Sequence, residues 1–193
     1  MYSMTEPFYD DRTFTGIDLS NTAPKTKEFD GCSFTSCNFS GSDFSGINFI
    51  DCRFDECNLS LIKLTGTGLK NVEFAGCKII GVDFSVATDL LLSVKFEKCN
   101  LEFSHFYKKK LKNTSFKDCK IKEANFTETD LTGSAFIQCD LLNTVFDRTI
   151  LHSVDFRTSY NYTLDPAVNI IKKAKFSYQG VIGLLYKHDI VIE

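Results

Sequence analysis

The chain has 193 residues, 43% of them apolar, and a net charge of −3, so one domain with a sizeable core is expected and a generally basic nucleic-acid binder is excluded. Three prolines and eleven glycines exclude collagen-like and proline-rich disordered chains. No run of about 18 apolar residues occurs, so we expect no membrane span. The N-terminus lacks the basic-then-apolar pattern of an export signal, and we therefore expect a cytoplasmic protein.

An internal repeat of five residues explains an unusual composition of 19 Phe and no Trp. Every fifth residue from Phe29 to Phe84 is Phe, Leu or Ile, and after a shift of two residues the same spacing runs from Phe96 to Phe156. The residue two before each large one is mostly small or β-branched. All eight cysteines occupy this position: Cys32, Cys37, Cys52, Cys57, Cys77, Cys99, Cys119 and Cys139. A period of five matches neither an α-helix nor a plain strand.

Two inward residues in every five suit a coil that turns one corner per repeat. Four corners give a coil of about 20 residues, and successive coils would stack about 4.8 Å apart. This is the pattern of the pentapeptide-repeat family, and the resemblance implies an all-β solenoid, a right-handed quadrilateral β-helix with a short C-terminal helix. We place the β-helix at residues 1–159, re-phased at about 85–93, and a C-terminal capping and dimerisation segment at 160–193.

The cysteines are expected to be free, buried thiols. Residues one coil apart should stack, so Cys37, Cys57 and Cys77 form one set, and Cys99, Cys119 and Cys139 another. Disulfides are disfavoured because parallel stacked side chains point the same way, and zinc sites use shorter spacings together with His. We expect no metal and no cofactor.

Lys109 breaks the inward pattern, because a lysine stands where small residues are the rule. Either the chain bulges locally or the side chain extends outward to solvent, or Lys109 belongs to a functional basic loop.

Nothing in the sequence indicates catalysis. The three histidines are scattered, and no nucleotide-binding glycine loop, zinc-protease motif or nucleophile elbow occurs. A filled solenoid also leaves no obvious cleft, so we expect a protein that is not an enzyme.

The C-terminal tail has helical spacing. Ser177 can cap a helix to about His188, and Ile190–Ile192 looks like a short strand. The tail either caps its own coil or also pairs two chains. We expect a homodimer whose interface residues are Tyr178, Val181, Ile182, Leu184 and Leu185.

The tail from Tyr178 to Ile192 is similar to that of the Qnr-type quinolone-resistance proteins, in its Tyr-Gln opening, its Leu-Leu pair and its terminal Ile and Val residues. The resemblance implies a homodimer that binds DNA gyrase or topoisomerase IV as a mimic of duplex DNA and modulates quinolone sensitivity. Several members carry two projecting loops, and the unbroken spacing here predicts that both are absent. The alternative is a structural or protein-interaction module with an unrelated partner.

Acidic charge is concentrated towards the N-terminus. Residues 1–90 hold 13 Asp/Glu and 7 Lys/Arg, against 12 and 15 in residues 91–193. Lysines of the second half stand one coil length away from acids, which predicts cross-coil ion pairs and leaves no basic surface for nucleic acid or membrane. These expected pairs are Glu97–Lys117, Lys98–Asp118, Glu102–Lys122, Lys108–Glu128, Glu128–Arg148, Lys110–Asp130 and Lys120–Asp140.

The first half offers a candidate partner-binding strip. Asp30 and Asp51 are expected on one face, with Asp55 and Glu56 on the next, whereas Arg53 is expected to lie with Glu73. The alternative is an ordinary solvated face.

Overall fold

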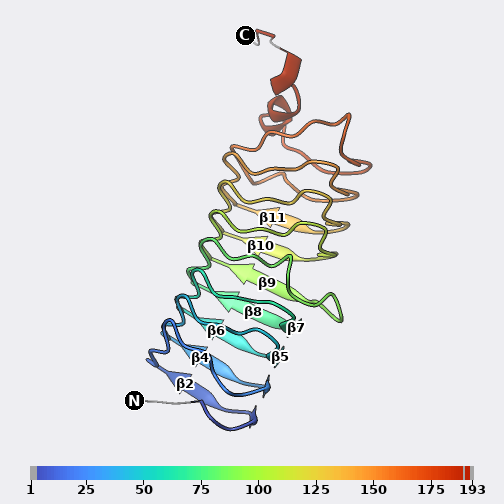
Figure 1. Ribbon diagram of the computed structural model, residues 1–193. Helices are drawn as coiled ribbons and strands as arrows, with labels where there is room; N and C mark the ends of the chain where they lie inside the picture. The colour runs from blue at the N-terminus through green and yellow to red at the C-terminus, as the bar shows by residue number, and fades with distance from the viewer. Residues whose placement is uncertain (1–3, 189, 192–193) are drawn as a thin grey trace.

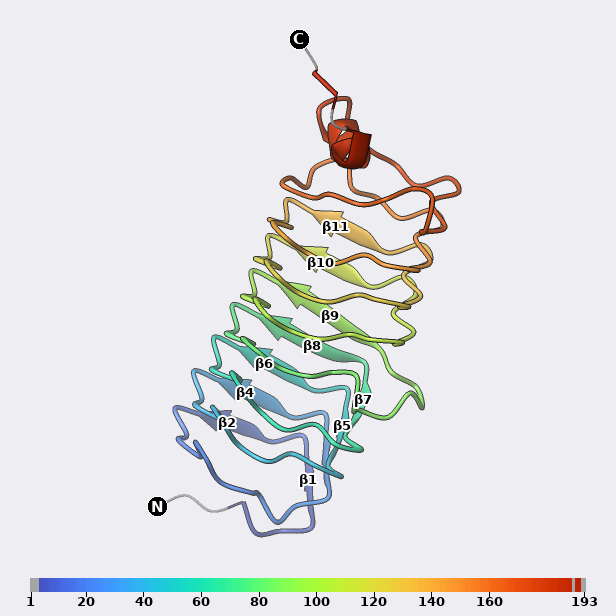
Figure 2. The same cartoon turned by 45° about the horizontal axis from the view of Figure 1, so that its top comes forward.

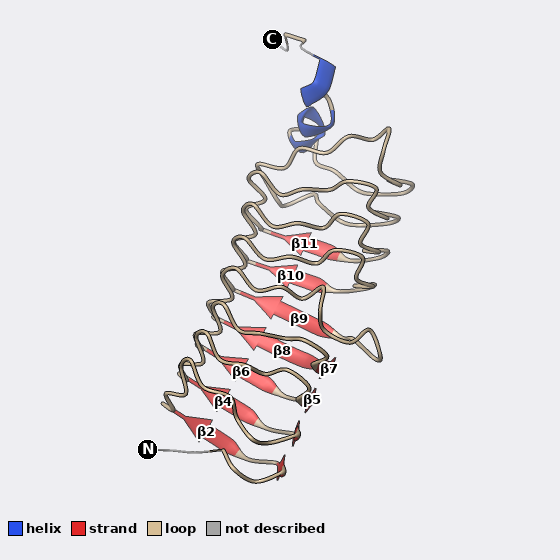
Figure 3. Ribbon diagram, in the orientation of Figure 1, coloured by secondary structure: helices blue, strands red, loops and turns tan. Residues whose placement is uncertain are grey.

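The computed structural model describes residues 4–188 and 190–191. The chain winds into a single column of stacked coils, with the N-terminal coil at one end and the C-terminal segment at the other (Figure 1). Strands occupy two faces of this column and are coloured in Figure 3. One sheet contains β1 (Phe8–Asp10), β3 (Glu28–Asp30), β5 (Asn48–Ile50) and β7 (Gly68–Lys70). The other contains β2 (Thr13–Thr15), β4 (Ser33–Thr35), β6 (Arg53–Asp55), β8 (Val72–Ala75), β9 (Val94–Glu97), β10 (Ser115–Lys117) and β11 (Ala135–Ile137).

All described strand pairs are parallel, and the strands are short because the chain turns a corner every five residues. Isolated parallel bridges such as Asn38 to Asn58 and Asp43 to Lys63 hold the other two faces together. The predicted right-handed quadrilateral β-helix is confirmed.

The register between coils equals the coil length that the sequence predicts. Phe14 lies opposite Phe34, and Phe34 opposite Phe54. At the re-phasing segment the offset grows by two residues, so that Phe74 pairs with Phe96. The two additional residues leave the column as a projecting segment beside β7, visible in both orientations (Figures 1 and 2).

Stacked phenylalanine rings fill the axis. The fully buried Phe116 ring lies 5.3 Å from the Phe96 ring and 4.7 Å from the Phe136 ring, nearly parallel to both. It also meets the Phe126 ring edge-on at 5.9 Å. Because the rings alternate stacked and edge-on contacts, each ring stabilises its neighbours in two directions.

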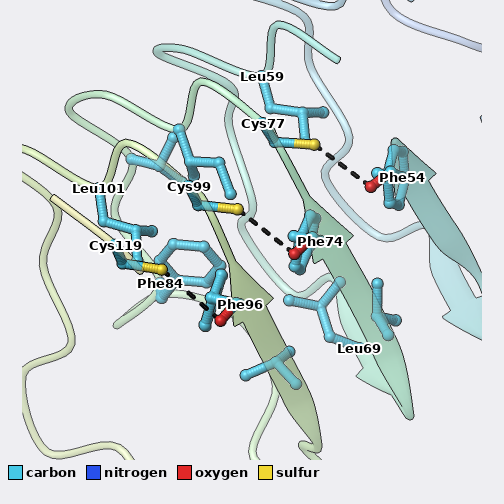
Figure 4. Packing of buried hydrophobic residues seen from close by; sticks show 14 of the residues in the cluster. Phe54, Leu59, Leu69, Phe74, Cys77, Phe84, Phe96, Cys99, Leu101 and Cys119 are labelled. Atoms are coloured by element: carbon cyan, nitrogen blue, oxygen red, sulfur yellow. Dashed lines mark hydrogen bonds between the residues drawn. The ribbon is translucent and has the colours of Figure 1, made fainter. Parts of the chain in front are cut away.

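The small inward side chains add a second set of contacts. Their hydroxyl or thiol groups donate to the backbone carbonyl of a large residue in the preceding coil: Thr129 Oγ1 lies 2.7 Å from the Phe106 oxygen, and Cys77 Sγ lies 3.4 Å from the Phe54 oxygen (Figure 4). Where the inward residue is Cys, Ser or Thr, this hydrogen bond thus links successive coils.

The eight cysteines are free and buried, as predicted. Each lies two residues after the end of a strand. The expected two sets of three form one column of six, because the longer offset at the re-phasing segment places Cys99 next to Cys77. Burial raises the pKa of the Cys52 thiol to about 12.

The coil continues beyond residue 159. Ile170 bridges to Ile150, Lys175 bridges to Asp155, and the Phe176 ring stacks on Phe156 at 5.5 Å. The repeat is hard to see here because Asn161 and Pro166 stand where the spacing requires a large apolar residue. Tyr162 and Leu164 are buried nearby and supply the apolar contacts.

The expected single helix from Ser177 to His188 is wrong in type and extent, since two 3-10 helices, Gly180–Leu184 and Tyr186–His188, are found. Gly183 lies against the backbone of Tyr162, and its carbonyl accepts the Leu164 N–H at 3.2 Å, so it is not available for an α-helical bond. Ser177 Oγ does accept the Gly180 N–H, as a cap would. Ile190 and Val191 are not in a strand, and Ile192 lies outside the described residues.

Replacing Phe116 with Ala should lower the free energy of unfolding by about 3–5 kcal/mol, because the stacked neighbours cannot close the resulting cavity. The matched control is Phe103→Ala, since Phe103 is a corner residue that is half exposed. Urea denaturation measures both variants. Equal losses would show that the ring stack is not the main source of stability.

The thiols give a second test. Few should react with a thiol reagent in the native protein, and all eight should react after denaturation without prior reduction. Fewer than eight free thiols in freshly purified protein would contradict the buried, reduced column.

Candidate partner-binding surfaces

Acidic side chains without a basic partner gather in the first half of the column. Among the described residues, only three acids before residue 91 form an ion pair: Asp55, Glu73 and Asp89. The acids of this half that form no ion pair with another described residue are Glu6, Asp10, Asp11, Asp18, Glu28, Asp30, Asp43, Asp51, Glu56 and Asp83.

In the second half most of the acids form an ion pair. The acids that do form ion pairs there are Glu97, Glu128, Asp130, Asp140, Asp147, Asp155 and Asp165. Across residues 91–188, only Glu102, Asp118 and Glu123 remain without one.

Four of the unpaired acids meet where β1, β3 and β5 end. Asp10 lies directly opposite Asp30 in the parallel pair, and the Asp11 N–H donates to the Asp30 carbonyl at 2.9 Å. Asp51 occupies the same corner one coil further on, where its carboxylate accepts the Asn71 side-chain amide at 2.7 Å. We call Asp10, Asp11, Asp30 and Asp51 the acidic corner.

The coil geometry produces this corner. Asp11 and Asp51 have positive φ angles of 45° and 52°, a conformation that Asp, Asn and Gly adopt more readily than other residues. Gly31 stands between them in the stack, and the Asp11 side chain lies over its open face. The corners of three successive coils thus each carry at least one carboxylate.

The four residues of the predicted strip lie at two different places on the surface. Asp30 and Asp51 share the acidic corner, whereas Asp55 and Glu56 lie at the end of β6 and just after it. Asp55 is not a free charge, because Arg53 Nε lies 2.7 Å from its carboxylate while Arg53 also contacts Glu73 at 2.9 Å. Glu56 is outside this ion-pair network and accepts a weak hydrogen bond from Ser36 at 3.5 Å.

We did not predict Asp10 and Asp11 as part of the acidic strip, although their spacing in the sequence indicates it. Asp10 precedes Asp30 by one coil length, and Asp11 precedes Asp51 by two.

Three of the seven expected cross-coil ion pairs form in the second half. The pair of Glu97 and Lys117 is confirmed at 2.8 Å, that of Lys108 and Glu128 at 3.5 Å, and that of Glu128 and Arg148 at 3.3 Å. The four other pairs are wrong. Asp130 contacts Lys112 at 3.2 Å in place of Lys110, and Asp140 contacts Lys122 at 3.2 Å in place of Lys120.

A local hydrogen bond explains these changed partners. Asp130 accepts the backbone N–H of Thr132 at 3.0 Å, which turns its carboxylate forward along the chain and brings it over Lys112.

The C-terminal segment presents a second surface. Four of the predicted dimerisation residues, Tyr178, Val181, Ile182 and Leu185, are exposed, and Tyr178 keeps 90% of its surface accessible. Leu184 instead packs against the core of the coil, so it holds the segment in place.

Neither described helix is long enough to cross a membrane. Within residues 4–188 and 190–191, no cluster of three or more His, Cys, Asp or Glu side chains is arranged to hold a metal ion.

Comparison with known proteins identifies the fold family. The model of the pentapeptide repeat region matches residues 27–88 and 90–163. No curated protein matches the sequence. Full-length QnrB1, a plasmid-mediated fluoroquinolone resistance protein, has a similar structure, with 18% identity, a TM-score of 0.53, and coverage of 95% of this chain and 100% of that chain.

A second similar structure is HetL of Nostoc sp. strain PCC 7120, a pentapeptide repeat protein involved in heterocyst differentiation regulation. It has 14% identity and a TM-score of 0.42, over 86% of this chain and 88% of that chain. With the family model covering most of its length, the chain belongs to the pentapeptide-repeat family.

Proposed function

We propose that this protein binds a bacterial type II topoisomerase, DNA gyrase or topoisomerase IV, in place of duplex DNA and thereby modulates quinolone action in the cytoplasm. The observation that carries the proposal is the concentration of unpaired acids in the first half of the column. The likeness to QnrB1, which is a fluoroquinolone resistance protein, supports the choice of partner.

The charge density of the first half supports mimicry. Residues 1–90 carry a net charge of −6. They form about four coils, or about 19 Å of axis at about 4.8 Å per coil. Duplex DNA carries one charge per about 1.7 Å, so this half has about half the linear charge density of DNA.

Dimerisation through the C-terminal segment would place these charges at the far ends of a long rod. The C-terminal segment and the acidic half lie at opposite ends of the column (Figure 1). A symmetric pair joined by the C-terminal segments would therefore expose both acidic halves, and we include this homodimer in the proposal.

Neutralising three of the four acids of the acidic corner should weaken the effect on gyrase at least about tenfold, because the attraction depends on their charge. The test variant is D10N/D30N/D51N. The control variant, E102Q/D118N/E123Q, removes the same charge from unpaired acids of the second half.

A supercoiling assay with and without quinolone compares the two variants, and the difference should shrink as salt is raised. If the test variant acts on gyrase as strongly as the wild type, the corner is a solvated face. If the wild-type protein has no effect on gyrase or topoisomerase IV, the proposed function is wrong.

Dimerisation is tested separately with I182D/L185D. Burying each of these side chains contributes about 1.5–3 kcal/mol, so placing charges there should give monomers in sedimentation. Leu142→Asp is the control, because Leu142 is also exposed but lies on the coil. A double variant that stays dimeric would place the interface elsewhere.

A further inference from the structure

Lys109 is buried in an inward column that also contains threonines. Its nearest residues in this column are Ala87 and Thr129, and Thr67 and Thr149 lie one coil further away on either side. The hydroxyl groups of these three threonines each donate to a Phe carbonyl of the preceding coil. Lys109 is only 4% exposed. Its longer side chain reaches the re-phasing segment, where Nζ donates to the Ala87 carbonyl and forms an ion pair with the Asp89 carboxylate at 2.8 Å. The lysine therefore points towards this segment and not outward to solvent.

Both flanks of the re-phasing segment are bonded to the preceding coil. The Thr88 N–H donates to the Thr67 carbonyl, and the Ser93 N–H donates to the Leu69 carbonyl, each at 2.9 Å. Between these flanks the chain makes a turn that begins at Asp89, the residue that Lys109 holds. The turn is thus fixed at both ends and at its first residue.

The turn exposes two leucines. Leu90 is 76% exposed, and Leu91 is 63% exposed with a positive φ of 58°. Leu92 packs against the core, whereas the two leucines before it are exposed. We call Leu90 and Leu91 the leucine tip. Re-phasing a coil by two residues requires extra length but no apolar side chains, so connectivity alone does not account for the tip.

The leucine tip lies next to the sheet that carries the acidic corner. The bonds to Thr67 and Leu69 place the segment against β7, which continues the sheet of β1, β3 and β5. Figure 2 shows it projecting beside β7. An apolar projection and an acidic corner at two ends of one sheet can contact the same partner surface, as apolar anchors and charged rims do in protein interfaces.

We propose that the leucine tip inserts into an apolar pocket of the protein that binds the acidic corner, and that Lys109 is the positioning residue that holds the tip through Asp89. This inference rests on the proposed function, so the partner in the test is gyrase or topoisomerase IV.

Affinity for the topoisomerase is measured for four variants and the wild type. L90S/L91S should bind at least tenfold more weakly. Leu61→Ser is the matched control, because Leu61 is also a corner residue, with a φ of 58° and 65% exposure, but is not part of the projecting segment. It should bind like the wild type.

Lys109→Thr supplies the hydroxyl that the column neighbours use, so the coil should be retained while Asp89 loses its partner. It should weaken binding, and the combined variant K109T/L90S/L91S should bind no more weakly than L90S/L91S, since Lys109 acts only through the tip. Additive losses would show that Lys109 has a general structural role and would overturn the positioning assignment.

Hydrogen exchange provides a readout that needs no partner. In the Lys109→Thr variant, the Leu92 amide, which bonds to the Asp89 carbonyl at 3.4 Å, should exchange at least tenfold faster while amides of neighbouring coils are unchanged. Unchanged exchange would overturn the positioning role.

The outcomes separate the two proposals. If the wild-type protein binds the topoisomerase and L90S/L91S binds equally well, the leucine tip is not an anchor and the proposed function stands. If the wild-type protein binds neither topoisomerase, the proposed function and the partner assigned to the tip both fail, and the role of Lys109 is decided by hydrogen exchange alone.

Discussion

The constant register between coils is the constraint on which the rest of the structure depends. It places each residue directly over the residue one coil earlier, so the core, the hydroxyl and thiol contacts and the surface charges all become columns. Within the core this gives stacked rings such as Phe116 between Phe96 and Phe136. On the surface the same stacking either pairs opposite charges, as in Glu97 and Lys117, or brings like charges together, as in Asp10 and Asp30.

The fold could be predicted from the sequence because the large inward residue recurs every five positions from Phe29 to Phe84 and from Phe96 to Phe156. Features that depend on side-chain direction or on a break in the register could not. The column of six cysteines was divided in two because the sequence shows the shift of two residues but not that the coils stack continuously across it, with Cys99 next to Cys77. The partner of Asp130 was wrong because a hydrogen bond to its own chain turns the carboxylate away from Lys110.

The same limits apply to the candidate surfaces. Asp30 and Asp51 were predicted from their outward positions. The ion pair of Asp55 with Arg53 could not be predicted, because it depends on the length and direction of the Arg53 side chain. Lys109 was recognised as an exception in the sequence. Its ion pair with Asp89 could not be foreseen, because the path of the re-phasing segment is set by bonds to the preceding coil. In the C-terminal segment, contact between Gly183 and Tyr162 prevents the α-helix that the apolar spacing suggests.

The two halves of the column have different surfaces on one continuous core. Most acids of the second half form ion pairs and its net charge is +3, whereas the first half has a net charge of −6, and the projecting segment with Lys109 and Asp89 lies at their boundary. One repeat thus provides a rigid support on which a charged surface and an apolar tip are held at fixed positions.

The most direct test of the account is an equilibrium competition between this protein and labelled duplex DNA for gyrase. If the acidic half takes the place of DNA, added protein should displace the DNA, and the concentration needed should rise in proportion to the DNA present. DNA that remains bound at saturating protein, in a complex containing all three components, would contradict the central claim.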